Sequence, residues 1–188
     1  MRREQVLSLL KPLLSHAPIY FSRLTSFQMA AVLVIIHYNF PRPHVLLTKR
    51  SSSLRSHTAE ISFPGGKYTA DDECLTDTAI RETKEELGLT FNRNDIIGSL
   101  DTVKTLTSNY NIVPYITLQD KIPEPIIFVD EVEKVLDVPL FDLLQTMASD
   151  TDHYHLTLKE VYKFTSQNEV IWGATARVLK QLYDCFCR

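Results

Sequence analysis

Residues 65–89 read GGKYTADDECLTDTAIRETKEELGL, and this stretch decides the fold. A glycine pair is followed by an acidic turn and by an amphipathic segment that ends in RETKEELG. If residues 72–87 form a helix, Glu82, Glu85 and Glu86 stand at positions i, i+3 and i+4 and share one face. Carboxylates at this spacing repel one another, so we expect a cation to bind there. A divalent metal ion held by carboxylate oxygens is the natural candidate, and a solvated acidic surface is the alternative.

The glycines add information that is independent of the glutamates. The chain has only five glycines, and three of them, Gly65, Gly66 and Gly88, bracket this one segment. Gly88 follows the expected helix, where a left-handed residue commonly closes a helix C-terminus. A Gly-Gly pair lets the backbone approach a metal or a phosphate closely, although an ordinary turn also uses such a pair. Next to the glutamates, the pair favours a metal- or phosphate-binding loop.

The pattern Arg-Glu-x-x-Glu-Glu-x-Gly at residues 81–88, preceded by Gly-Gly and an acidic residue, resembles the Nudix box. Nudix enzymes hydrolyse a nucleoside diphosphate linked to another moiety and use Mg²⁺ or Mn²⁺ as cofactor. Glu73 lies eight residues before Arg81, which is the spacing of the family. Gly66 lies fifteen residues before Arg81, one more than in the general box. That extra residue is a feature of the coenzyme A pyrophosphatase branch.

The sequence on either side of the box resembles the same branch. Residues 46–66 read LLTKRSSSLRSHTAEISFPGG, which is similar to the second signature of the branch. Residues 130–140 and 171–177 resemble two further segments, so the resemblance extends over about residues 28–182. One departure is Ala59-Glu60, which stands where the branch usually has Gly-Gln.

The resemblance implies roles for individual acidic residues. Glu82, Glu85 and Glu86 carry the metal ions, together with the backbone of Gly66, and Glu82 or Glu85 doubles as the catalytic base. Glu131 is a second candidate for the base or a ligand, against the alternative of a solvated strand end.

Two further charged residues of the box have expected structural roles. Arg81 is expected to form a salt bridge that orients a glutamate, which suits its bidentate guanidinium. Glu73 is expected to be structural, with a peripheral place among the metal ligands as the alternative.

Basic residues on both sides of the glycine pair are candidates for substrate binding. As a group inside the branch signature, they are expected to contact the phosphates of coenzyme A, including its 3′-phosphate; any one alone could equally be a surface charge. They are Lys49, Arg50, Arg55, His57 and Lys67.

Composition limits the class of protein. A chain of 188 residues with 44% hydrophobic and 23% charged residues is expected to form one globular domain over residues 1–188. A net charge of −3 provides no basic surface for nucleic acid or a membrane. The three cysteines, Cys74, Cys185 and Cys187, form neither a disulfide framework nor a zinc spacing. We therefore expect a reducing, cytoplasmic setting.

Hydrophobic periodicity predicts the remaining elements. A leading helix is expected at residues 3–15, with Pro12 as an early end, and further helices at 141–147 and 171–186. Strands are expected at 29–38, 44–48, 96–105, 112–118 and 132–138, and a hairpin from 153–158 with 161–164. Short connections between strands and helices indicate an α/β fold. The resemblance implies the Nudix fold, a mixed β-sheet sandwiched between helices.

The function that these observations favour is hydrolysis of the diphosphate of coenzyme A or its thioesters. The products would be adenosine 3′,5′-bisphosphate and 4′-phosphopantetheine. One alternative is a Nudix hydrolase of a dinucleotide, a nucleotide sugar or an oxidised nucleotide. The other is a catalytically silent Nudix domain that senses a ligand, although such domains usually lose a carboxylate. The expected partner is a small-molecule substrate, with a homodimer left open.

Overall fold

The computed structural model describes residues 1–15, 28–51, 60–106, 108–128, 132–151 and 161–187. Its helices are α1 (Arg3–Leu10), α2 (Leu75–Leu87), α3 (Leu140–Gln145) and α4 (Gly173–Phe186), with short 3₁₀ turns η1 (Lys11–Leu13) and η2 (Arg93–Asp95). The strands are β1 (Gln28–His37), β2 (His44–Arg50), β3 (Ile61–Ser62), β4 (Gly65–Lys67), β5 (Ile96–Ser99), β6 (Val103–Lys104), β7 (Tyr110–Gln119), β8 (Val132–Pro139), β9 (Ala148–Ser149), β10 (Tyr162–Ser166) and β11 (Glu169–Ile171).

The main sheet is mixed and has the strand order β3-β2-β1-β7-β5, with β4, β6 and β8 paired to β1, β7 and β2. β1 runs parallel to β7 along its whole length. On its other edge β1 has two antiparallel partners, because β2 pairs at Ile36 and His37 whereas β4 pairs at residues 30–32. The glycine pair of β4 therefore lies at the end of β1 opposite to the β1–β2 turn.

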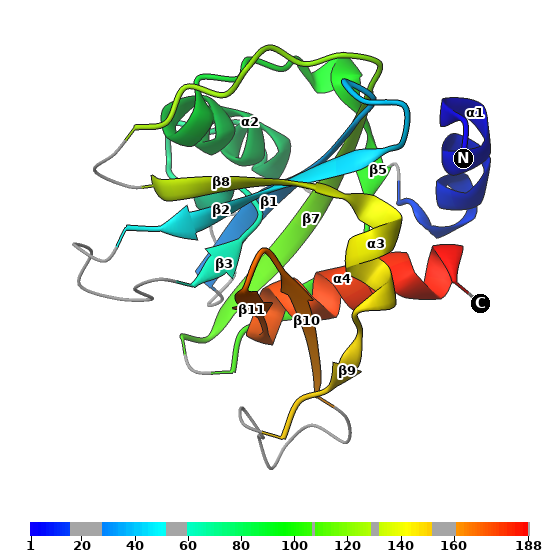
Figure 1. The fold of residues 1–188 in the computed structure, drawn as a ribbon. Coiled ribbons are helices and arrows are strands. Elements are labelled where there is room, and N and C mark those ends of the chain that lie inside the picture. The colour runs from blue at the N-terminus through cyan, green and yellow to red at the C-terminus, as the bar shows by residue number, and fades with distance from the viewer. Residues whose placement is uncertain (16–27, 52–59, 107, 129–131, 152–160, 188) are drawn as a thin grey trace.

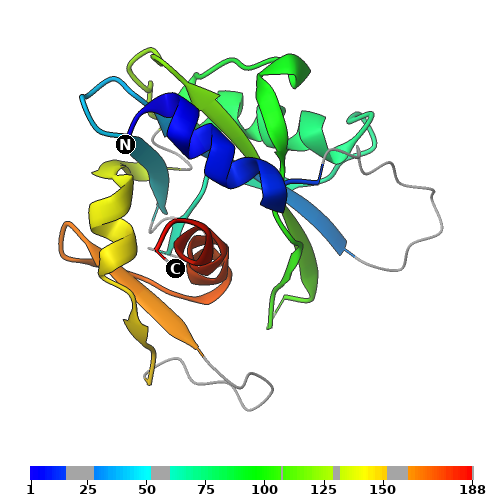
Figure 2. The same cartoon turned by 90° about the vertical axis from the view of Figure 1, so that its right-hand side faces the viewer.

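The sheet lies between two helical layers, and the residues of β1 show why. Successive side chains of a strand point to opposite faces. Ala31, Leu33 and Ile35 enter the core that includes α2, whereas Val34 and Ile36 enter the core that includes α1, α3 and α4. Figure 1 shows α2 on one face of the sheet. Figure 2 shows α1 and α4 on the side of the sheet away from α2. The predicted sandwich of a mixed sheet between helices is confirmed.

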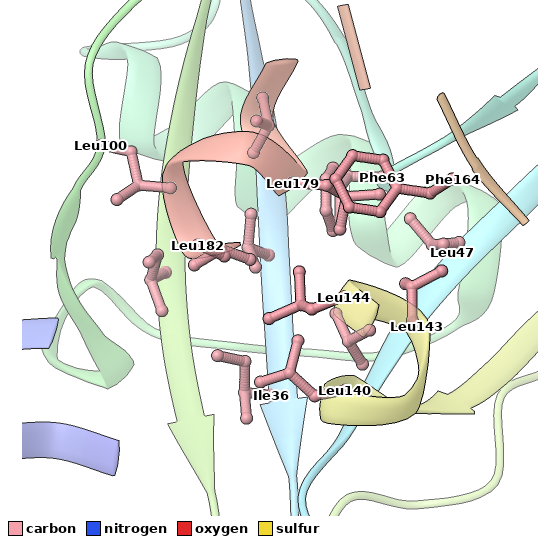
Figure 3. Close-up of a cluster of buried hydrophobic side chains, with 14 of the residues drawn as sticks. Ile36, Leu47, Phe63, Leu100, Leu140, Leu143, Leu144, Phe164, Leu179 and Leu182 are labelled. Carbon is pink, nitrogen blue, oxygen red and sulfur yellow. The ribbon is translucent and has the colours of Figure 1, made fainter. Parts of the chain in front are cut away.

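The larger core closes the face of the sheet opposite to α2. Figure 3 shows side chains of α3 and α4 pointing toward those of β1 and β2. Phe63, which precedes the glycine pair, points into this core and is 2% exposed. Burial of this side chain fixes the chain where it turns from β3 into β4.

Some element boundaries differ from the predictions. The leading helix ends at Leu10 and continues as a 3₁₀ turn through Pro12, and the glutamate helix begins at Leu75, not at residue 72. The segment 96–105 forms two short strands, β5 and β6. β10 forms its hairpin with β11, because Gln167 and Asn168 have φ values of 50° and 64° that suit a tight turn. The predicted strand at 153–158 lies outside the described residues.

No helix among the described residues is both long enough and apolar enough to cross a membrane.

Candidate active site

The glutamate helix α2 is fixed against the sheet by its own sequence pattern. The side chain of Asp77 accepts a hydrogen bond from the backbone N–H of Cys74 at 3.2 Å, which caps the first turn. Gly88, with a φ of 66°, ends the helix, and its N–H donates to the carbonyl of Lys84. Residues at every fourth position form a buried stripe on the sheet side: Leu75, Ala79, Thr83 and Leu87.

The three glutamates lie beside this stripe and differ in exposure. The side chain of Glu86 is 4% exposed, that of Glu82 is 17% exposed and that of Glu85 is 53% exposed. The expected shared face is thus a band that runs from the buried side of the helix to solvent. A buried carboxylate is costly unless it is paired, and Glu86 has the N–H of Gly65 and the guanidinium of Arg50 as partners.

Arg81 connects the acidic turn to two of the glutamates. Its Nε and Nη2 donate to the two carboxylate oxygens of Asp72 at 2.9 and 3.0 Å. Its Nη1 donates to Glu82 at 2.9 Å and to Glu85 at 3.0 Å. The salt bridge predicted for Arg81 is present, but its bidentate partner is Asp72, which was not among the predicted site residues.

The hydrogen-bond donors around Asp72 favour its ionised form. It also accepts hydrogen bonds from the backbone N–H of Thr69 at 3.1 Å and from the hydroxyl of Thr78 at 2.8 Å. Burial by itself would raise the pKa of Asp72, but the hydrogen bonds from Arg81, Thr69 and Thr78 outweigh it and lower the pKa to about 2. A fixed negative charge therefore orients the guanidinium that contacts Glu82 and Glu85.

The glycine pair brings the backbone of β4 against the other side of these carboxylates. A Cβ placed on Gly66 would lie 2.3 Å from Cδ of Glu82 and 2.4 and 2.5 Å from its oxygens. The N–H of Gly65 donates to Glu86 at 3.3 Å. Gly65 has a φ of 150°, and a Cβ there would lie 2.3 Å from the carbonyl oxygen of Ala31. Only glycine at both positions allows this approach.

These donors fit a hard divalent cation. Carboxylate oxygens and a closely approaching backbone are ligands that Mg²⁺ and Mn²⁺ accept. Among the described residues, no three His, Cys, Asp or Glu side chains are already arranged around one point. Arg81 instead contacts one oxygen of Glu82 and one of Glu85. The residues that could hold the ion are Glu82, Glu85 and Glu86, with the backbone of Gly66.

The basic residues expected at the substrate side have different surroundings. Arg50 ends β2 with Nη1 3.9 Å from Glu86, and its buried Nε has no hydrogen-bond partner in the described part of the chain. Lys67 ends β4 with its ammonium 5.3 Å above the ring of Tyr110. Arg50 is therefore beside the glutamates, and Lys67 follows the glycine pair directly.

Lys49 is already paired within the protein. Its ammonium contacts Glu169 of β11 at 2.9 Å and Glu133 of β8 at 3.4 Å. The hydrogen bond with Glu169 raises the pKa of Lys49. The side chain thus links β2, β8 and β11, and a phosphate would have to compete with two carboxylates for it.

Three predicted site residues, Arg55, His57 and Glu131, lie outside the described residues. Glu73 is described, and its 78% exposed side chain contacts Arg93 at 2.6 Å. Arg93 also contacts Asp77 at 2.6 Å, so both acids lie in a charge network at the start of α2. This network agrees with the structural role expected for Glu73.

The fold and the site define an α/β domain that holds a band of glutamates against a glycine pair, as in metal-dependent hydrolases of phosphate anhydrides. The family model of the NUDIX domain matches residues 28–157, so the chain belongs to the Nudix family. The chain is 33% identical over 168 residues to an "Uncharacterized Nudix hydrolase NudL" of Yersinia pestis, an alignment that covers 87% of this chain and 81% of that protein. The chain is thus a Nudix pyrophosphohydrolase.

Two solved structures share the fold. A MutT/nudix family protein from Enterococcus faecalis matches with a TM-score of 0.58 and 15% identity, over 98% of this chain and 69% of that chain. The NUDIX domain of NrtR from Shewanella oneidensis, solved with ADP ribose, matches with a TM-score of 0.53 and 23% identity. That match covers 66% of this chain and 82% of the NrtR chain.

Proposed function

We propose that this enzyme hydrolyses the diphosphate of coenzyme A or its thioesters to adenosine 3′,5′-bisphosphate and 4′-phosphopantetheine. Residues 46–66 resemble the coenzyme A branch, and the observation that carries the proposal is the place of the described parts of this segment, residues 46–51 and 60–66. Their two described ends contact the glutamate band, since Arg50 lies 3.9 Å from Glu86 and Gly65 donates to the same carboxylate. The branch-like segment thus borders the residues that would act on the diphosphate.

Glu82, Glu85 and Glu86 would hold Mg²⁺ or Mn²⁺, which withdraws charge from diphosphate oxygens and acidifies water when bound. The contribution of the protein is to orient the carboxylates that would hold the ion. Asp72 holds Arg81, and Arg81 holds one oxygen each of Glu82 and Glu85. These bonds orient the two carboxylates, which would still have to turn toward one point before they share an ion.

The base that accepts the proton of the attacking water is proposed to be Glu85 or Glu82, with Glu131 as the third candidate. Glu85 is supported by its exposure of 53%, because its carboxylate can reach solvent while Arg81 holds it. A base must lie within hydrogen-bond reach of the water, directly or through one further water. Glu86 is buried and is assigned to the metal alone.

Recognition of the phosphates is proposed for Arg50 and Lys67 at the diphosphate and for Arg55 and His57 at the 3′-phosphate. Arg50 is supported by its Nε, which has no hydrogen-bond partner among the described residues, because such a guanidinium donor suits a phosphate oxygen. Lys49 stays in the proposal as an outer contact, since its charge is compensated by Glu133 and Glu169. The free thiols of Cys74, Cys185 and Cys187 support a reducing, cytoplasmic setting.

The proposal is tested by a substrate panel with the purified enzyme in Mg²⁺, in Mn²⁺ and in a chelator. The kcat/KM values of coenzyme A, acetyl-coenzyme A, dephospho-coenzyme A, ADP-ribose and a diadenosine dinucleotide are compared. We expect coenzyme A or its thioester to exceed the last two substrates at least about tenfold, which corresponds to roughly 1.4 kcal/mol. A higher kcat/KM for ADP-ribose or the dinucleotide would assign the enzyme to another Nudix activity. Binding without turnover of any substrate would indicate a sensing domain.

A further inference from the structure

A fixed segment crosses α2 between β7 and β8. Residues 121–128 read KIPEPIIF, and Figure 1 shows this part of the chain passing over α2 before β8 begins. At its start, the side-chain amide of Asn39 donates to the carbonyl of Ile122 at 2.9 Å. The N–H of Ile122 in turn donates to the side-chain oxygen of Asn39 at 2.8 Å.

The other end of the segment is joined to the glutamate helix itself. The N–H of Ile126 donates to the carbonyl of Leu87 at 2.8 Å, and the N–H of Phe128 donates to the carbonyl of Glu86 at 3.4 Å. These carbonyls belong to the last turn of α2, where no intrahelical donor is available. Pro123 and Pro125 restrict the backbone between the two anchors. The segment is thus held at both ends and stiffened in the middle.

This segment presents three consecutive large apolar side chains to solvent. Ile126 is 66% exposed, Ile127 is 38% exposed and Phe128 is 50% exposed. We call these three residues the apolar ledge. Leaving such side chains in water forgoes the free energy of burial, and contiguous exposed apolar groups commonly mark a binding site. The hydrogen bond from Phe128 to Glu86 places the ledge at the helix end that carries the buried glutamate.

We propose that the apolar ledge binds the non-nucleotide half of the substrate, a deduction that rests on the proposed function. In coenzyme A, the carbon that bears two methyl groups follows the diphosphate after a single methylene on the pantetheine side. Ligand groups near the glutamate band are therefore apolar on this side and sugar-like on the adenosine side. An apolar surface beside the glutamates suits the methyl groups of the pantetheine side and offers few partners to the hydroxyl groups of the adenosine side.

The hydrogen bonding of the ledge argues against adenine as its occupant. A base is selected through donors and acceptors that meet its edges. The N–H groups of Ile126 and Phe128 are used by helix carbonyls, and the carbonyl of Phe128 accepts a hydrogen bond from Val132 at 3.1 Å. Methyl and methylene groups need no such partners. The ledge is therefore assigned to the pantetheine arm.

The test uses Phe128→Ser, with Phe128→Leu as the variant that keeps an apolar side chain. Steady-state kinetics give kcat/KM for coenzyme A, and calorimetry gives the Kd of 4′-phosphopantetheine and of adenosine 3′,5′-bisphosphate. One to two methyl-sized contacts change binding about tenfold or more. We expect Phe128→Ser to lower kcat/KM and raise the Kd of 4′-phosphopantetheine about tenfold, with adenosine 3′,5′-bisphosphate unchanged and Phe128→Leu close to wild type.

Leu13→Ser is the control, because Leu13 is 46% exposed and lies in η1, directly after α1, on the face of the sheet away from α2. It should change neither the turnover nor the two Kd values. An unchanged Kd of 4′-phosphopantetheine in Phe128→Ser overturns the proposal that the apolar ledge binds the pantetheine arm. An equal rise of both Kd values overturns it as well. A wild-type enzyme that does not hydrolyse coenzyme A overturns the proposed function instead, and the deduction falls with it.

Discussion

Gly66→Ala is expected to lower the turnover of the enzyme while leaving its free energy of unfolding nearly unchanged. Gly66 is not among the residues with positive φ, so its backbone conformation accepts alanine. The added Cβ would lie 2.3 Å from Cδ of Glu82, whereas ordinary contacts begin at 3.4 Å. The carboxylate of Glu82 must therefore move by about 1 Å, and a misplacement of about 1 Å can cost roughly 10²-fold in turnover.

The effect of Gly66→Ala on stability should be small. The displaced group is the far end of a flexible side chain, and the Glu82–Arg81 contact that it disturbs is worth up to about 1 kcal/mol. Replacing glycine by alanine at an accessible φ stabilises by about 0.4–1 kcal/mol, which offsets this loss. We therefore expect the free energy of unfolding in urea to stay within about 1 kcal/mol of wild type.

Gly65→Ala is the matched comparison. Its added Cβ would meet backbone atoms, at 2.3 Å from the carbonyl oxygen of Ala31 and 2.6 Å from Cα of Val32, at a φ of 150°. Backbone cannot move aside as a carboxylate can, so this variant should lose about 2–4 kcal/mol of stability.

A double-mutant cycle checks that Gly66→Ala acts through Glu82. In a Glu82→Ala background, the added methyl group has no carboxylate to displace, so a further loss of turnover should be absent. Full activity of Gly66→Ala would refute the reasoning, because the carboxylate could then move by about 1 Å without consequence. An equal loss in both backgrounds would show that the methyl group acts elsewhere.

Three further variants test other parts of the site. Glu86→Gln should fold and lose about 10²-fold or more in turnover, measured as kcat beside a urea unfolding curve, and a loss below about twofold would remove Glu86 from the metal ligands. Asp72 has a folded pKa of about 2, below its ordinary value of 3.8, so its stabilising effect is present above pH 4 and is lost as the pH falls toward 2. Over that range wild type should thus lose about 2 kcal/mol more than Asp72→Asn in denaturation measured at each pH, and an equally steep loss in the two proteins would contradict the role of the carboxylate. Arg50→Gln should lower kcat/KM about tenfold for both coenzyme A and dephospho-coenzyme A, because Arg50 lies beside Glu86. A loss confined to coenzyme A would instead place Arg50 at the 3′-phosphate.

The glutamate helix and its end were predictable from sequence because local rules govern them. Spacing puts Glu82, Glu85 and Glu86 together on any helix, and Gly88 is a usual helix terminator. Apolar and β-branched runs likewise predict β1 and β7, whose buried positions alternate between two cores in the structure. These features need no knowledge of what the elements pack against.

The start of the helix and the partner of Arg81 depended on tertiary contacts. Residues 72–74 are compatible with a helix in isolation, but Asp72 instead points its carboxylate at Arg81, and Cys74 occupies the capping position. The Asp71-Asp72 pair ahead of Arg81 was the available signal, since a partly buried guanidinium is stabilised by an acidic partner. The pairing of Lys49 with Glu169 joins positions 120 residues apart, and no sequence period reports such a contact.

Hydrolysis of coenzyme A at its diphosphate is tested by identifying the products of turnover by mass spectrometry, with Mg²⁺ and with a chelator. We expect adenosine 3′,5′-bisphosphate and 4′-phosphopantetheine in equal amounts, formed only when the divalent ion is present. Intact coenzyme A after incubation with active, folded enzyme would contradict the account. So would the same products formed at the same rate in the chelator.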